Sequence, residues 1–218
     1  MRILHPLVYQ GPRSFRHRKG YFEGWYYKFV SSDNRALAVI PGVSLQRSES
    51  FGFIQTIDGS NGDTSYTTYP LSEVVFSADP FQLVLGKSTF SLDQVVLADD
   101  LAVSGTITIK EPRLYTSTFT RPGIMGWYRY VPFMECYHGV VSTGHSLDGV
   151  LRVSTADGSE DVHFDGGRGY IEKDWGTSFP SSYIWMQSNS FSDSQYSCML
   201  SVARIPWFGS YFRGFLGF

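Results

Sequence analysis

The chain has 218 residues, of which 42% are hydrophobic, 17% aromatic and only 17% charged. This composition excludes general intrinsic disorder, which requires few aromatic residues and a high charge content. The net charge of −2 argues against a nucleic-acid-binding protein, because such proteins usually carry a basic excess. The length is that of one large domain or two small ones.

Short segments rich in valine and aromatic residues alternate with turn residues, a rhythm typical of an all-β sandwich or barrel. Stretches rich in Gly, Asp and Asn, such as Asp58–Asp63, separate these segments. The predicted strands are, in chain order, Tyr21–Val30, Ala36–Gln46, Ser50–Ile57, Ser65–Tyr69, Glu73–Phe76, Phe81–Leu85, Gln94–Leu97, Leu101–Lys110, Cys136–Ser142, Gly149–Val153, Val162–Ile171, Tyr183–Ser190, Tyr196–Ala203 and Tyr211–Phe218.

The region Glu111–Pro132 interrupts the strand rhythm and contains three prolines, which predicts a long crossover. We therefore expect an N-terminal β domain over residues 1–112 and a second β domain over residues 113–218, unless the halves form one continuous β unit. The chain ends in the apolar strand pattern Phe212–Phe218, and an exposed apolar edge strand favours aggregation. This pattern predicts that the C-terminal part is incomplete.

The first segment with candidate chemistry is Tyr21–Lys28, where Glu23 lies among aromatic residues. In a strand, Glu23 shares one face with Trp25 and Tyr27. Burial of a lone carboxyl among rings would raise its pKa and make it a proton donor near neutral pH. The alternative is that Glu23 sits at a bulge marked by Gly24 and binds backbone groups.

The second segment, Gly169–Pro180, places three charged residues between Tyr and Trp. Glu172 and Asp174 share one face if the strand continues, whereas Lys173 points away. Two close carboxylates have separated pKa values, so that one remains a base and the other is held as an acid. The alternative is a solvated strand end in which Lys173 neutralises both carboxylates.

The third segment, Trp127–His138, contains Glu135 and His138. These two face each other only in a helical turn and lie on opposite faces of a strand. His138 is an acid or base candidate because the pKa of histidine lies near the working pH. A packed, hydrogen-bonded histidine is the alternative.

The fourth segment, Tyr183–Phe191, places Trp185, Gln187 and Asn189 on one face of a strand. Amide side chains among rings indicate either a pocket wall that orients a polar head group or a satisfied core network. The pattern alone leaves both interpretations open.

Metal, nucleotide and disulfide signatures are missing from the sequence. The five histidines show no HxH or HExxH spacing, so we expect no metal site; the alternative is a facial triad drawn from distant positions of the chain. Two cysteines, Cys136 and Cys198, are too few for a disulfide framework and indicate a reducing compartment. We therefore expect a cytoplasmic protein. The basic run Arg13–Lys19 is either a solvated face or a site of peripheral contact with anionic lipid.

Taken together, these segments resemble the tocopherol cyclase family, most closely its bacterial members. The match lies in Tyr21–Lys28, Pro132–His138, Tyr170–Gly176 and Trp185–Asn189, in the family's order and rough spacing. The resemblance implies a lipocalin-like antiparallel barrel or sandwich, and a longer C-terminus in family members. It also implies a cofactor-free reaction, in which the phenol of a prenylated hydroquinone adds across the nearest tail double bond to close a chromanol ring.

That chemistry requires an acid, a base and aromatic faces around a hydrophobic prenylated small molecule. The expected alternatives are a non-catalytic carrier of an isoprenoid ligand, and an alkene hydratase or other isomerase on the same scaffold. Carboxylates that converge in a cavity would favour an enzyme. The candidate catalytic residues are Glu23, Glu172 or Asp174 as the acid and His138 or a partner carboxylate as the base, with Glu135 as a further candidate. The candidate residues for stabilising the cation are Trp25, Trp175 and Trp185, and the other candidate substrate-binding residues are Tyr27, Gln187 and Asn189.

Overall fold

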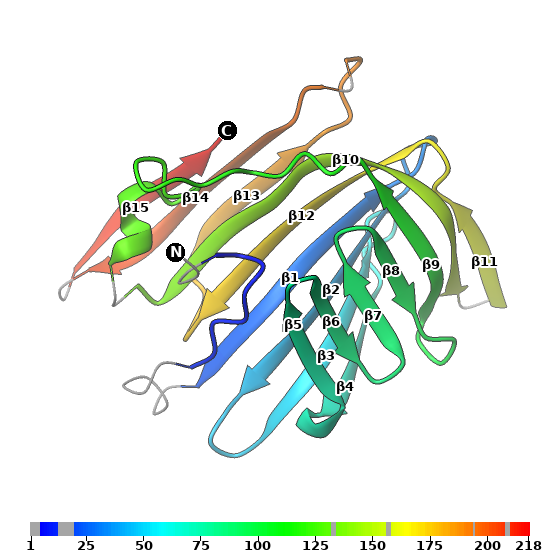
Figure 1. The fold of residues 1–218 in the computed structure, drawn as a ribbon, viewed down its shortest axis with the longest axis horizontal. Coiled ribbons are helices and arrows are strands. Elements are labelled where there is room, and N and C mark those ends of the chain that lie inside the picture. The colour runs from blue at the N-terminus through cyan, green and yellow to red at the C-terminus, as the bar shows by residue number, and fades with distance from the viewer. Residues whose placement is uncertain (1–4, 13–19, 132–133, 156–157, 194, 208–209) are drawn as a thin grey trace.

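The computed structural model describes residues 5–12, 20–131, 134–155, 158–193, 195–207 and 210–218, which fold into an all-β protein of antiparallel strands (Figure 1). The all-β prediction is confirmed. The elements are β1 (Tyr21–Val30), β2 (Ala36–Leu45), β3 (Ser50–Asp58), β4 (Thr64–Pro70), η2 (Leu71–Glu73), β5 (Val74–Ala78), β6 (Phe81–Leu85), β7 (Ser88–Ser91), β8 (Gln94–Leu97), β9 (Val103–Lys110), η3 (Gly126–Tyr130), β10 (Cys136–Thr155), β11 (Gly158–His163), β12 (Gly167–Gly176), β13 (Tyr183–Ser188), β14 (Cys198–Trp207) and β15 (Ser210–Gly217).

A twelve-stranded sheet curls over its own hydrophobic core. Its strand order is β4-β3-β2-β1-β12-β10-β9-β8-β7-β6-β5, with β11 paired to β10, and β5–β8 lie across from β1–β4 in Figure 1. Trp25 of β1 packs against Phe76 and Phe81, with ring centroids 5.7 Å apart in each case, and Tyr27 packs against Phe90. The curled sheet therefore encloses a core as a barrel or sandwich does.

The three-stranded sheet β13-β14-β15 packs against the other face of the large sheet. Trp185 of β13 contacts Tyr26 of β1 edge-on at 5.4 Å, and Met199 of β14 packs with Tyr170 of β12. The central strands β1, β12 and β10 thus direct alternate side chains to two different environments. One face contributes to the curled core, and the other faces the small sheet.

The large sheet draws strands from both predicted halves of the chain. β9 pairs with β10, and β1 pairs with β12, so that hydrogen bonds of one sheet join residues on both sides of the expected boundary at residue 112. The division into domains 1–112 and 113–218 stays a prediction. The alternative, in which both halves form one continuous β unit, fits the strand order of this sheet.

Some strand predictions are wrong in detail. β10 is one strand where the sequence pattern predicts two, because register shifts between Val140 and His145 let the strand bend and continue. The predicted strand Val162–Ile171 is divided into β11 and β12 by a turn in which Gly166 has a φ of 71°. The short strand β7 was not predicted.

The N-terminal segment, residues 5–12, crosses the core side of the large sheet. Its Leu7 and Tyr9 pack against the core, and Tyr9 stacks on Phe76 with ring centroids 4.3 Å apart. The indole nitrogen of Trp25 donates a hydrogen bond to the carbonyl of Pro6 at 2.9 Å. The basic run Arg13–Lys19 lies outside the described residues. Among the described residues, the helices are too short and polar to cross a membrane.

Candidate functional site

Two neighbouring strands, β10 and β12, bring polar residues from two of the predicted motifs together beside β1. Gly24 of β1 lies opposite Asp174 of β12, and Asp174 lies opposite His138 of β10. Glu172 is two residues from Asp174 and projects from the same face of β12. The prediction that Glu172 and Asp174 share a face is confirmed by the cluster they form with His138.

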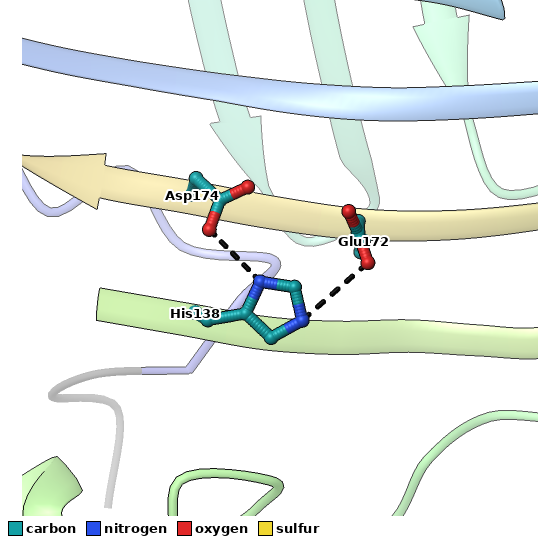
Figure 2. A group of neighbouring side chains, drawn as sticks. All are labelled: His138, Glu172 and Asp174. Carbon is teal, nitrogen blue, oxygen red and sulfur yellow. Dashed lines mark hydrogen bonds and ion pairs between the residues drawn. The ribbon is translucent and has the colours of Figure 1, made fainter. Parts of the chain in front are cut away.

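His138 lies between the two carboxylates, as Figure 2 shows. Its Nδ1 is 2.8 Å from Oδ1 of Asp174, and its Nε2 is 3.4 Å from Oε2 of Glu172. The hydroxyl of Tyr170, which is fully buried, donates a hydrogen bond to Oε2 of Glu172 at 2.7 Å. We call His138, Glu172 and Asp174 the acid–imidazole cluster.

Burial and mutual charge shift the pKa values within the acid–imidazole cluster. Burial raises the pKa of Glu172 to about 7; the neighbouring His138 opposes this rise and Asp174 adds to it. Burial alone would lower the pKa of His138, but Glu172 and Asp174 outweigh that effect and raise the pKa to about 9. Near neutral pH the cluster therefore holds an imidazolium next to a carboxyl that readily gains and loses a proton.

The acid–imidazole cluster faces a cavity of about 710 Å³ between the large sheet and the small sheet. Strands of the large sheet contribute Tyr26 and Phe53 to its wall, and the small sheet contributes Trp185, Ala203 and Phe212. Most of this lining is aliphatic or aromatic. A cavity of this size and character suits a hydrophobic ligand with a few polar atoms.

The cluster also has the donor atoms of a metal site. The three side chains offer one ligand atom each within 4.8 Å of one another, so that they could hold a divalent cation. Imidazole and carboxylate donors suit several transition metals. The expectation that no metal takes part stays a prediction.

Glu23 lies on the opposite face of the sheet, away from the cavity. It forms a fully buried ion pair with Lys173, and its carboxylate accepts hydrogen bonds from the backbone N–H groups of Gln10 and Gly11 and from the hydroxyl of Tyr21. The interpretation of Glu23 as a lone carboxyl is therefore wrong. The predicted backbone binding is confirmed, but the register of β1 runs past Gly24 without a bulge.

Lys173 is buried rather than placed at a solvated strand end. Its Nζ donates to the carbonyl of Val8 at 2.7 Å and lies 4.4 Å from the ring centroid of Trp25 and 4.8 Å from that of Trp175. Burial lowers its pKa to about 8, while Glu23 opposes the shift. The alternative in which Lys173 neutralises Glu172 and Asp174 is wrong, because its charge is paired on the other face.

Only one of the predicted aromatic ligands of a substrate lines the cavity. Trp185 does so, whereas Trp25, Tyr27 and Trp175 are buried away from the lining. Trp25 and Tyr27 are odd-numbered residues of β1. Because side chains alternate along a strand, both lie on the face that packs into the curled core. Trp175 likewise stacks on Tyr137, with ring centroids 5.6 Å apart.

Gln187 and Asn189 connect the end of β13 to the large sheet. The side-chain oxygen of Gln187 accepts a hydrogen bond from Nζ of Lys28 at 2.7 Å, and the buried amide of Asn189 donates to the carbonyl of Gly169 at 2.8 Å. Neither residue lines the cavity. These contacts fit a core network better than a pocket wall that holds a head group, although the network is satisfied only in part, because Oδ1 of Asn189 is buried without a hydrogen-bond partner among the described residues.

Glu135 lines the cavity but is bound to a neighbouring loop. Its carboxylate accepts a hydrogen bond from the hydroxyl of Ser178 at 3.0 Å, and it precedes β10, so that it is not part of the acid–imidazole cluster. The sequence reasoning missed Tyr26 and Tyr170. Both lie on the cavity side of their strands, and the alternation within the two motifs could have indicated them.

A second buried histidine, His145, predicts the acid sensitivity of the fold. Burial lowers its pKa to about 3, and Arg113 adds to the shift. Below about pH 6.5 the imidazole of His145 binds a proton in the unfolded chain but stays neutral in the folded chain. The free energy of unfolding should therefore fall as the pH drops from about 6.5 towards 3. Urea unfolding over this pH range should show a smaller loss of unfolding free energy for His145→Gln than for the parent. Parallel plots of unfolding free energy against pH for the two proteins would contradict the prediction.

The all-β fold is shared with a solved structure of low sequence identity. The crystal structure of CghA with Sch210972 matches with a TM-score of 0.65 and 10% identity, over 91% of this chain and 57% of that chain. The chain therefore spans little more than half the length of that protein. Matches at TM-scores of 0.48 and 0.47 are a putative AttH from Nitrosomonas europaea (11% identity, 92% of this chain, 67% of that one) and kievitone hydratase from Nectria haematococca (12%, 89% and 59%).

The family is indicated by a separate match. Residues 106–205 match the family model described as tocopherol cyclase-like, which confirms over that range the family predicted from the motifs. The matched segment contains all three residues of the acid–imidazole cluster. No protein of curated function matches the chain.

Proposed function

We propose that the protein is a cyclase that closes a chromanol ring on a prenylated hydroquinone, within the cavity between the two sheets. The observation that carries this proposal is the acid–imidazole cluster, His138, Glu172 and Asp174, set in a mostly apolar cavity wall. An apolar cavity accepts a prenyl tail, and a carboxyl with a raised pKa can supply a proton near neutral pH.

Glu172 is the proposed proton donor. Its carboxyl O–H bond breaks as the proton adds to the less substituted carbon of the tail double bond, which leaves a tertiary carbocation and a Glu172 carboxylate. The hydroxyl of Tyr170 then stabilises the carboxylate through the hydrogen bond at 2.7 Å. Hydrogen bonding to the charged form lowers the cost of giving up the proton.

Aromatic rings beside Glu172 are suited to stabilise the carbocation. Tyr26 and Trp185 both line the cavity and contact each other edge-on at 5.4 Å. A cation over such rings gains about 2 kcal/mol or more when water is excluded. These rings replace Trp25 and Trp175 as the residues proposed for this role.

The acid–imidazole cluster also accounts for the second proton. As the phenol oxygen bonds to the cationic carbon, its O–H proton passes to Asp174. His138, hydrogen-bonded to Asp174 and next to Glu172, provides a route by which a proton returns to Glu172. One proton enters and one leaves, so that the product is an isomer of the substrate.

The two alternatives differ in what they require of the cavity. A carrier of an isoprenoid ligand needs an apolar cavity but has no use for two carboxylates at its wall, where desolvation is costly. A hydratase would use the same acid but would direct water rather than phenol at the cation. The cavity wall supports an enzyme over a carrier, and the product distinguishes ring closure from hydration.

The test is to incubate the purified chain with a prenylated dimethylhydroquinone under argon and to analyse the products by mass spectrometry and chiral chromatography. A single chromanol enantiomer of unchanged mass is expected, with and without EDTA. A product heavier by one water would indicate a hydratase. Dependence on a divalent cation would overturn the cofactor-free mechanism, and substrate bound but unchanged would favour a carrier.

The turnover should fall as the pH rises through about 7. A carboxyl donor works only while protonated, and the raised pKa of Glu172 places loss of that proton near 7 instead of the ordinary 4.5. The measurement is kcat/KM against pH. A fall centred near 4.5 would mean that a carboxyl of ordinary pKa is the donor.

A further inference from the structure

Gly24 is a strand glycine that the backbone does not require. It lies inside β1, and its φ is outside the left-handed region. A Cβ built at Gly24 would meet its nearest neighbours, the carbonyl oxygen of Pro41 and the side chains of Ile40 and Phe53, at 3.5–3.6 Å, which is ordinary van der Waals contact. Alanine would therefore fit.

The glycine opposite shows the contrast. Gly42 pairs with Gly24 across β1 and β2, and a Cβ at Gly42 would come within 2.5 Å of the carbonyl oxygen of Glu23. Close approach of the two strands thus requires glycine at Gly42 but not at Gly24. Because glycine weakens the interior of a strand relative to alanine, packing and backbone geometry leave Gly24 unexplained.

The position of Gly24 at the cavity supplies a reason. Gly24 lines the cavity and is the direct neighbour of Asp174 across β1 and β12. The side chains nearest to the vacant Cβ position are those of Ile40 and Phe53, which also line the cavity. Glu172 lies two residues from Asp174 along β12, so that their Cα atoms are about 7 Å apart at the rise of a strand.

We propose that Gly24 determines specificity for the head group, because the aromatic ring of the substrate lies against the part of the cavity wall where Gly24 carries no side chain. This inference rests on the proposed cyclase function. A ring lying against Gly24 would present its phenol oxygen to Asp174, while the first tail double bond would extend towards Glu172. A flat ring fits against a strand that carries no side chain, whereas a Cβ would lift it away from the carboxylate.

The test compares the variant Gly24→Ala with the parent in the binding of two ligands. Both are hydroquinones with the same prenyl tail, one with an unsubstituted ring and one with ring methyl groups, and binding is measured by quenching of tryptophan fluorescence. We expect Gly24→Ala to weaken binding of the methylated ligand at least tenfold more than that of the unsubstituted ligand. Its thermal midpoint should equal or exceed that of the parent.

Ala203→Val is the matched control, because Ala203 lines the cavity from the small sheet and the change also fills space. It should weaken both ligands by similar factors. Equal factors for both ligands in Gly24→Ala, or a lowered thermal midpoint, would overturn the head-group assignment. Discrimination between the ligands without turnover would overturn the cyclase function alone, and failure of the parent to bind either ligand would overturn both.

Discussion

Replacement of Glu172 by glutamine is expected to lower kcat for ring closure by about a hundredfold to ten-thousandfold, the usual contribution of a general acid. The amide keeps the shape of the side chain and its contact with Tyr170 but carries no acidic proton. Binding of the substrate should change little, because the cavity wall is otherwise intact. Single-turnover kinetics with a prenylated dimethylhydroquinone measure the effect, and fluorescence quenching measures binding.

Glu49→Gln is the matched control for this loss. Glu49 is an exposed carboxylate outside the described cavity lining, so that its amide variant should retain the parent's kcat. Asp174→Asn should lower kcat as well, because Asp174 is the proposed acceptor of the phenol proton. Full activity of Glu172→Gln beside an inactive Asp174→Asn would assign the donor role to Asp174 and contradict the mechanism given for Glu172.

Lys173→Met is expected to lower the free energy of unfolding by about 3–5 kcal/mol, the usual cost of removing one partner of a buried ion pair. The change leaves the Glu23 carboxylate buried without its cation and frees the carbonyl of Val8 from its hydrogen bond. Methionine fills much of the space, so that an unpaired charge rather than a void causes the loss. Urea unfolding followed by circular dichroism measures it.

The double variant Glu23→Gln with Lys173→Met separates charge from packing. It removes both charges and should recover part of the stability lost in Lys173→Met. Lys87→Met, at an exposed lysine, should change stability by no more than about 0.5 kcal/mol. If the double variant is no more stable than Lys173→Met, burial of an unpaired carboxylate is not the cause.

The alternation of side chains explains why part of the site could be predicted. The spacing of Glu172 and Asp174 is enough to place both on one face of β12, and the structure confirms it. The same alternation applied to Tyr21–Lys28 puts Glu23, Trp25 and Tyr27 together, which is also correct. Period 2 groups residues by face but carries no information on which face meets a cavity.

The failures arise from contacts that are distant in the sequence. Glu23 looked like a lone carboxyl because its partner, Lys173, is 150 residues away in the chain and joins it only through pairing of β1 with β12. His138 could be named as an acid or base, but its position between two carboxylates depends on the register of β10 against β12. The bend that merges two predicted strands into β10 comes from bulges, which leave no periodic signal.

The run Glu172-Lys173-Asp174 has a consequence for folding. Its three consecutive side chains enter two compartments of opposite chemistry, the cavity and the curled core. Slippage of β12 by one residue would exchange those compartments, and two carboxylates would meet Glu23 in the core while the lone ammonium faced His138. Misregistered pairing would thus incur a large electrostatic penalty before any substrate arrives. The two carboxylates proposed for the reaction thus also help to fix the register of β12, the strand that carries them.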